Sequence, residues 1–160
     1  MNKYEKKEQK VFIVAIIAAI VLIINLFLPY ITPTERYKER HDDYYDISIM
    51  ELSDEFSGDD EHDKFYMVFF TICSILMGGF ALITLIGAIK KKTALLIIFP
   101  ILILGIILLM NWDLNGQGLV PSEYAKFGIG YYLYLLSIIT SVATGIIAIS
   151  LRKKSDYEVE

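Results

Sequence analysis

The stretch VFIVAIIAAIVLIINLFL at residues 11–28 decides the fold of this chain. It carries no charge, and Asn25 is its only strongly polar residue. At a rise of about 1.5 Å per residue, a helix of roughly this length nearly matches the ~30 Å hydrocarbon core of a bilayer. Because backbone groups cannot stay unpaired in lipid, we predict a transmembrane helix over residues 11–29.

A cleaved signal peptide is the alternative interpretation of this segment, because lysines precede it at positions 3, 6, 7 and 10. The apolar run, however, is longer than the roughly 7–15 residues of a signal-peptide core. It also ends at Pro29-Tyr30, without a small-residue cleavage motif. We therefore expect an uncleaved membrane anchor.

Three further stretches without charge lie at residues 65–89, 94–110 and 127–151. The second of them contains Pro100, which removes a helical hydrogen bond and predicts a kink near that residue. A soluble bundle would show a polar stripe at a 3.6-residue period, and none of these stretches has one. The sequence therefore predicts one membrane domain over residues 1–160, an all-α four-transmembrane-helix bundle.

Lysine and arginine counts on short flanks set the orientation of membrane helices. Basic clusters occupy residues 1–10, 90–93 and 152–160, which are therefore expected in the cytoplasm. Residues 30–64 and 111–126 then form the outer loops. The sequence thus predicts a multi-pass protein of the plasma membrane with both termini cytoplasmic, and its Ile, Lys and Tyr content suits a low-GC bacterium.

Aromatic residues gather near the predicted outer surface. Amphipathic rings favour the headgroup level of a bilayer, where an apolar face and a polar edge are both satisfied. We expect interface anchors at Tyr30, Tyr66, Trp112, Tyr131 and Tyr132.

The longer first outer loop, residues 30–64, is strongly acidic. Its acidic residues outnumber its basic ones and leave a charge of about −8. Ile47 and Ile49, with Tyr45, alternate with polar residues, which predicts a short half-buried strand. Ser53 is a plausible helix cap, so residues 53–56 are also predicted to open a short helix. The sequence of residues 57–60 is typical of a turn.

Carboxylates and two histidines in this loop raise the hypothesis of a divalent cation site. Oxygen ligands suit calcium, and histidine beside carboxylate suits zinc. No ligand spacing fixes a geometry, and a solvated acidic loop is the simpler interpretation. The candidate ligands are His41, Asp42, Asp43, Asp59, Asp60, Glu61, His62 and Asp63.

The predicted helix interiors contain no ionisable residue, which argues against a proton-coupled pump, an intramembrane protease or a metal-dependent lipid enzyme. The net charge of −4 provides no basic field for nucleic acid. A single cysteine, Cys73, excludes an internal disulfide framework. We expect no enzymatic activity and no cofactor.

Small and mildly polar residues recur four apart, a spacing that lets helix backbones approach closely. We predict helix packing through them, with a dimerisation face as the alternative. Asn25 is expected to bond a neighbouring helix. The packing candidates are Ala15, Ala19, Asn25, Ser74, Gly78, Ser137, Ser141 and Gly145.

The layout resembles a broad group of small uncharacterised bacterial four-helix membrane proteins. The resemblance rests on the step FLPY at 27–30, the phrase ISIMEL at 47–52, the basic turn at 90–92 and the opening FGIGYYL at 127–133. The topology is also similar to that of claudins. Their first outer loop carries a tryptophan signature and a cysteine pair, which residues 31–64 lack. The resemblance therefore implies a shared architecture and no activity.

These observations predict a non-enzymatic membrane protein that acts through its outer loops as an interaction, accessory or regulatory protein with a partner in the cell envelope. The partner would meet an acidic surface, which favours basic chemistry. The alternative is a small transporter or channel that works as a homo-oligomer.

Overall fold

The computed structural model of the chain describes residues 3–39, 45–56 and 61–157, without the side chains of residues 3, 56, 62 and 155–157. Four long helices dominate it. They are α1 (Lys3–Ile24), α3 (Glu61–Ile89), α4 (Thr93–Gly116) and α5 (Ile129–Tyr157). The shorter elements are η1 (Asn25–Phe27), β1 (Pro29–Pro33), α2 (Glu35–Lys38), β2 (Ile47–Ser48), η2 (Asp54–Phe56) and β3 (Ala125–Phe127).

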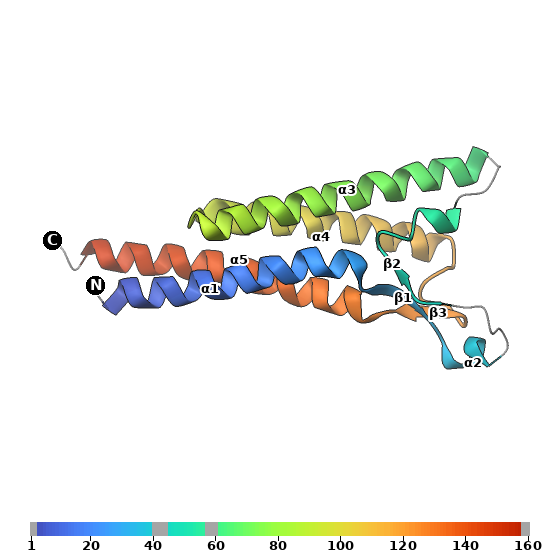
Figure 1. Cartoon of the computed structure of the whole chain (residues 1–160), viewed down its shortest axis with the longest axis horizontal. Coiled ribbons are helices and arrows are strands. Elements are labelled where there is room, and N and C mark those ends of the chain that lie inside the picture. Colours follow the sequence, from blue (N-terminus) through green and yellow to red (C-terminus); the bar gives the residue numbers. More distant parts are fainter. Residues whose placement is uncertain (1–2, 40–44, 57–60, 158–160) are drawn as a thin grey trace.

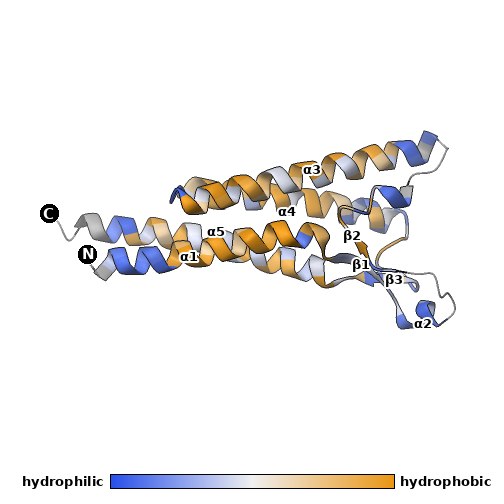
Figure 2. Ribbon diagram, in the orientation of Figure 1, coloured by the Kyte–Doolittle hydropathy of each residue, from blue (hydrophilic) through white to orange (hydrophobic). Residues whose placement is uncertain are grey.

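The four long helices form one elongated bundle (Figure 1). Each is long and apolar enough to cross a membrane, and apolar residues cover the middle of the bundle (Figure 2). Helix α1 packs on α5 and α3, and α4 packs on α3 and α5. Both ends of the chain lie at one end of the bundle, and the three strands lie at the other (Figure 1). The predicted four-helix architecture is confirmed at this level.

The helix ends differ from the predicted boundaries. Helix α1 ends at Ile24, and the chain turns through η1 into β1. Pro29 accounts for the extended backbone of Leu28, with φ −88° and ψ 153°, because a proline disfavours helical geometry at the preceding residue. Helix α4 continues to Gly116, beyond the predicted end at residue 110, so the start of the predicted outer loop belongs to the helix.

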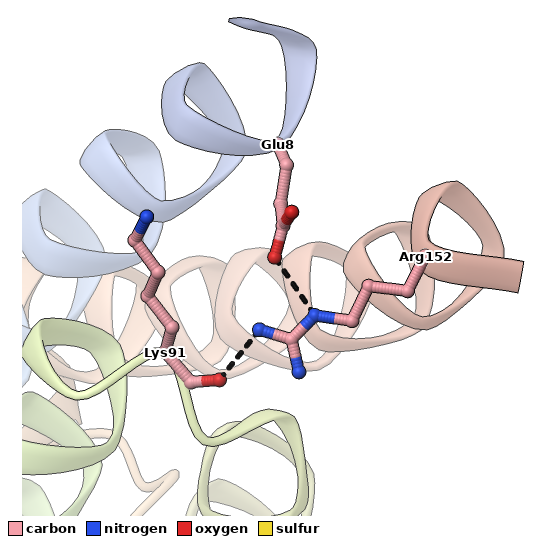
Figure 3. Close-up of polar contacts among 3 residues, drawn as sticks. All are labelled: Glu8, Lys91 and Arg152. Atoms are coloured by element: carbon pink, nitrogen blue, oxygen red, sulfur yellow. Dashed lines mark hydrogen bonds and ion pairs between the residues drawn. The ribbon is translucent and has the colours of Figure 1, made fainter. Parts of the chain in front are cut away.

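Arg152 ties three parts of the bundle together at the end that holds the termini (Figure 3). Its Nε donates to Glu8 Oε1 of α1 at 2.8 Å, and its Nη2 donates to the carbonyl of Lys91 at 2.9 Å. The guanidinium also lies 5.6 Å from the ring centroid of Phe12. Lys91 has a φ of +54° in the turn between α3 and α4. A planar guanidinium suits this arrangement because its donors point in several fixed directions.

The three strands form an antiparallel sheet in the order β2-β1-β3. The predicted strand near residue 47 is confirmed, but its alternation is not, because Ile47, Ser48 and Ile49 are all buried. The predicted helix at 53–56 is a single 3-10 turn, η2. The turn predicted at residues 57–60 lies outside the described residues.

Candidate functional site

The sheet and its connections form a folded unit that we call the sheet lobe, comprising the described residues within 29–56 and residues 117–127. Its apolar side chains, among them Ile31, Ile49 and Val120, belong to the same buried cluster as Met77 and Ile107 of the long helices. The lobe is therefore an extension of the bundle core and does not behave as a detached loop.

A β-bulge in β1 allows two adjacent residues of this strand to be buried. Pro29 pairs with Ser48 and Ile31 pairs with Ile47, so Tyr30 is the extra residue on the β1 side. A bulge breaks the strict alternation of a strand and re-aims its side chains. Tyr30 and Ile31 are consequently both buried although they are adjacent.

Tyr30 lies inside the protein, in contrast to the expected interface anchor. Its hydroxyl donates to Asn111 Oδ1 of α4 at 2.6 Å, and its ring makes edge contacts with Phe127 and Tyr131. Burial, with the nearby Tyr131 as a lesser cause, raises the pKa of Tyr30 well above its ordinary value. A buried polar group is tolerated when it is hydrogen-bonded, and Asn111 provides this partner.

Two glycines let the start of α5 touch the start of β1. The Gly128 N–H donates to the Tyr30 carbonyl at 2.8 Å. A Cβ at position 128 would collide with the Pro29 carbonyl oxygen and would lie 2.7 Å from Thr32 Oγ1. A Cβ on Gly130 would lie 2.8 Å from the same Pro29 oxygen. Glycine is required here because two backbones approach more closely than any side chain allows.

The turn after β2 packs against the end of the bundle that holds the strands. Ser74 of α3 donates its hydroxyl to the Ile49 carbonyl at 2.9 Å, and the Met50 N–H donates to the Leu26 carbonyl at 3.3 Å. Ser48 is buried because its N–H and hydroxyl both donate to Glu51 Oε2, at 2.9 and 2.8 Å. These bonds hold the turn in one conformation and explain why the predicted polar face of the strand is absent.

The Ser48–Glu51 contact gives a prediction for pH. The backbone bond and then the hydroxyl bond from Ser48 hold the pKa of Glu51 below its ordinary value of 4.5. A carboxyl whose pKa is depressed by folding stabilises the native state above its unfolded pKa, and this contribution is lost as the pH falls through the folded pKa. We expect the turn that contains Ser48 and Glu51 to loosen only in acid, as the pH falls through the folded-state pKa of Glu51.

A titration of the Glu51 side-chain carbon by NMR in the full chain measures this pKa directly. The expected result is a midpoint below 4.5 that moves partly back in Ser48→Ala, which keeps the backbone donor. An unshifted midpoint in the unmodified chain would contradict the prediction.

The sheet lobe contains an open cavity of about 160 Å³. Strands β1, β2 and β3, the 3-10 turn η2, the end of α4 and the loop after α4 all contribute to its wall. Among the described residues that line it, Glu55 is charged and the others are apolar. The lining consists of Ile31, Ile47, Leu52, Glu55, Leu114, Leu119, Val120 and Ala125.

Backbone bonds fix the loop on one side of this cavity. The N–H groups of Leu119 and Val120 donate to the Leu114 carbonyl at the end of α4, at 2.9 and 3.4 Å. The Ser122 hydroxyl then accepts from the N–H groups of Tyr124 and Ala125. Such local bonds from a serine side chain stabilise tight turns. These hydrogen bonds fix the loop that forms this side of the cavity wall.

A second hollow of about 240 Å³ lies on the bundle surface between α1 and α5. It is almost wholly apolar and falls within the two predicted membrane spans. Lipid chains fill such surface grooves without a specific site, so we place the candidate site in the sheet lobe. The groove is lined by Val14, Ile17, Ala18, Val21, Leu133, Leu136, Ser137 and Thr140.

The structure does not assemble the hypothetical cation site within the residues that it describes. Glu61 and Asp63 lie in the first turn of α3, and His62 lies between them with its side chain outside the description. No group of three metal-ligating residues occurs in the described part of the chain. The remaining candidates, His41, Asp42, Asp43, Asp59 and Asp60, lie outside the described residues.

Most of the predicted packing residues are buried between the helices. They are Ala15, Ala19, Asn25, Ser74, Ser137, Ser141 and Gly145, whereas Gly78 is half-buried. A Cβ on Gly145 would lie 2.7 Å from Ile97 Cγ1, which shows how closely α5 approaches α4.

Asn25 does not make the predicted hydrogen bond to a neighbouring helix within the described part of the chain. It is fully buried in η1, yet its amide nitrogen and oxygen have no hydrogen-bond partner in the described part of the chain. Helix α1 ends just before Asn25, and the 3-10 turn that holds it packs close to α5. The hydroxyls of Tyr134 and Ser141 are likewise buried and unpaired among the described residues.

The other four predicted anchors lie on the helices. Trp112 is 75% exposed and Tyr132 is 60% exposed, and their role as interface anchors stays a prediction. Tyr66 and Tyr131 are half-buried, and Tyr131 stacks on Phe127 with ring centroids 4.3 Å apart.

Sequence reasoning missed the cavity. Ile47 and Leu52 lie in the phrase that predicted a strand, but Ile31, Leu114, Leu119 and Val120 fell in outer loops. Four large apolar residues in loops were the available signal, because isolated loops rarely expose so many. Comparison of the chain with protein-family models, curated proteins and solved structures gives no match, so its role is argued from its own residues.

Proposed function

We propose that this chain is a non-enzymatic protein of the plasma membrane that binds a partner protein of the cell envelope through its sheet lobe. The four apolar helices hold the lobe at a membrane surface, and the basic clusters at the opposite end support a cytoplasmic position for both termini. The chain would then act as an accessory or regulatory subunit.

One observation carries this proposal: the core of the bundle continues into the sheet lobe. A chain that needed only to cross the membrane would gain nothing from ordering this region, since fixing each residue costs about 1–2 kcal/mol of backbone entropy. The lobe nevertheless leaves large apolar side chains in the open, namely Tyr45, Met50, Leu119 and Tyr124. Structured lobes with exposed apolar and aromatic groups are typical of protein-binding surfaces.

Site-specific labelling and crosslinking in cells test the proposal together. In a Cys73→Ala background, Glu123→Cys places a thiol on the lobe and Lys90→Cys places one at the opposite end. A membrane-impermeant maleimide is expected to label position 123 in intact cells, and position 90 only after permeabilisation. A photocrosslinker on position 123 is then expected to yield one discrete protein adduct that the position-90 control does not give.

Two results would overturn the proposal. Labelling in the reverse pattern would place the lobe in the cytoplasm. Crosslinking at position 123 without a protein adduct, together with solute flux in vesicles that hold only this chain, would favour a homo-oligomeric transporter or channel instead.

A further inference from the structure

We propose that the cavity of the sheet lobe is a recognition pocket for one apolar side chain of the partner, with an adjacent lysine or arginine of that partner paired to Glu55. This inference rests on the proposed function and names the chemistry of its ligand.

The size of the cavity limits the occupant. A cavity of roughly 150 Å³ with an apolar lining accepts a benzene ring in a well-studied engineered protein. The cavity here, about 160 Å³, therefore takes one ring or one branched aliphatic side chain. A whole helix or a long lipid chain does not fit in it.

The lining favours an apolar occupant over water. Among the described lining residues, seven of the eight have apolar side chains, so the larger part of the wall offers water no side-chain hydrogen bond. Leu119 at the lining is 40% exposed, so the cavity is accessible from solvent. An apolar side chain from a partner would cover surface that the described residues leave exposed.

The negative charge of Glu55 favours a basic residue beside the apolar side chain of the partner. Glu55 is exposed, and none of the described residues that line the cavity is basic. The Glu55 carboxylate raises the pKa of Tyr45, chiefly through a side-chain hydrogen bond and then through its charge, so the two groups are neighbours. A carboxylate has several acceptor positions, so a lysine or arginine can still bind it. The same negative charge disfavours the phosphate of a lipid headgroup.

Peptide selection on the purified full chain in lipid nanodiscs tests the pocket without knowledge of the natural partner. A displayed library of linear seven-residue peptides is the probe, and the strongest binder is then synthesised with a dye for anisotropy measurements. The expected sequences contain one Leu, Ile, Met or Phe beside one Lys or Arg. Acidic sequences, or sequences without an apolar residue, would overturn the inference.

Matched variants locate the binding. Glu55→Lys reverses the charge in the lining, whereas Asp54→Lys makes the same change at an exposed neighbour that does not line the cavity. Affinity is expected to fall about tenfold or more in the first and less than about twofold in the second. Ala125→Leu fills the cavity and is expected to abolish binding. Because Glu55 is exposed, its variant tests the pocket even where Ala125→Leu does not fold.

The outcomes separate the two proposals. Equal losses in Glu55→Lys and Asp54→Lys would show a general charge effect and overturn the pocket. A protein adduct at position 123 that survives both pocket variants would also overturn the pocket while leaving the proposed function intact. A photocrosslinker at Leu119 that captures lipid or a second copy of this chain would replace the proposed occupant.

Discussion

Replacing Gly128 by alanine is expected to cost about 1–3 kcal/mol of stability or more and to open the sheet, because overpacking a fixed contact forces backbone shifts. The new methyl group would meet the Pro29 carbonyl oxygen, which is backbone and cannot turn aside. The same shift would break the bond from the Gly128 N–H to the Tyr30 carbonyl. Unfolding in mixed micelles measures the stability, and amide exchange over residues 125–128 reports the sheet.

Gly105→Ala is the matched control for this substitution. Gly105 lies in α4, and a Cβ there would find no atom within 4 Å. Alanine is favoured over glycine inside a helix by about 1 kcal/mol, so this variant is expected to be neutral or slightly more stable. Equal stability of the two variants would refute the close contact between β1 and the start of α5.

Tyr30→Phe is expected to destabilise the chain by about 0.5–1.5 kcal/mol, since it removes the hydrogen bond to the half-buried Asn111. The change removes only the hydroxyl that bonds Asn111 at 2.6 Å and keeps the ring contacts with Phe127 and Tyr131. The measurement is the same micelle unfolding equilibrium.

Tyr134→Phe is the matched control, because it makes the same chemical change with the opposite expected effect on stability. Its hydroxyl is buried and has no partner among the described residues. Burying an unpaired hydroxyl is costly, so its removal is expected to leave the stability unchanged or to raise it. If Tyr30→Phe were the more stable of the two variants, the assigned hydrogen bond would be wrong.

The helices could be predicted because the signal for them is local. Four charge-free runs of suitable length leave no other structure for a chain in lipid. The helix boundaries were harder to predict, since capping and proline geometry determine where each helix ends. Helix α1 ends at Ile24 and the chain is extended at Leu28, before Pro29, whereas the apolar pattern continues through Leu28.

The sheet could be predicted only in part because its pairing is long-range. Strand β1 begins and ends with proline, which normally argues against a strand, and its bulge removes the alternation that identifies one. Strand β3 has three residues and carries no pattern of its own. Tyr30 was misjudged for the same reason, because its partner Asn111 comes from a helix far along the chain.

The order of the strands has a consequence for biosynthesis. The central strand β1 leaves the ribosome early, and its neighbour β3 follows only after α3 and α4 have been made. Throughout that interval β1 has one short partner and an unpaired edge, and unpaired edges invite association with other chains. A nascent chain that stops before residue 125 would therefore expose the edge of β1 that β3 covers in the folded protein, so the interval between the synthesis of β1 and that of β3 is its most vulnerable period.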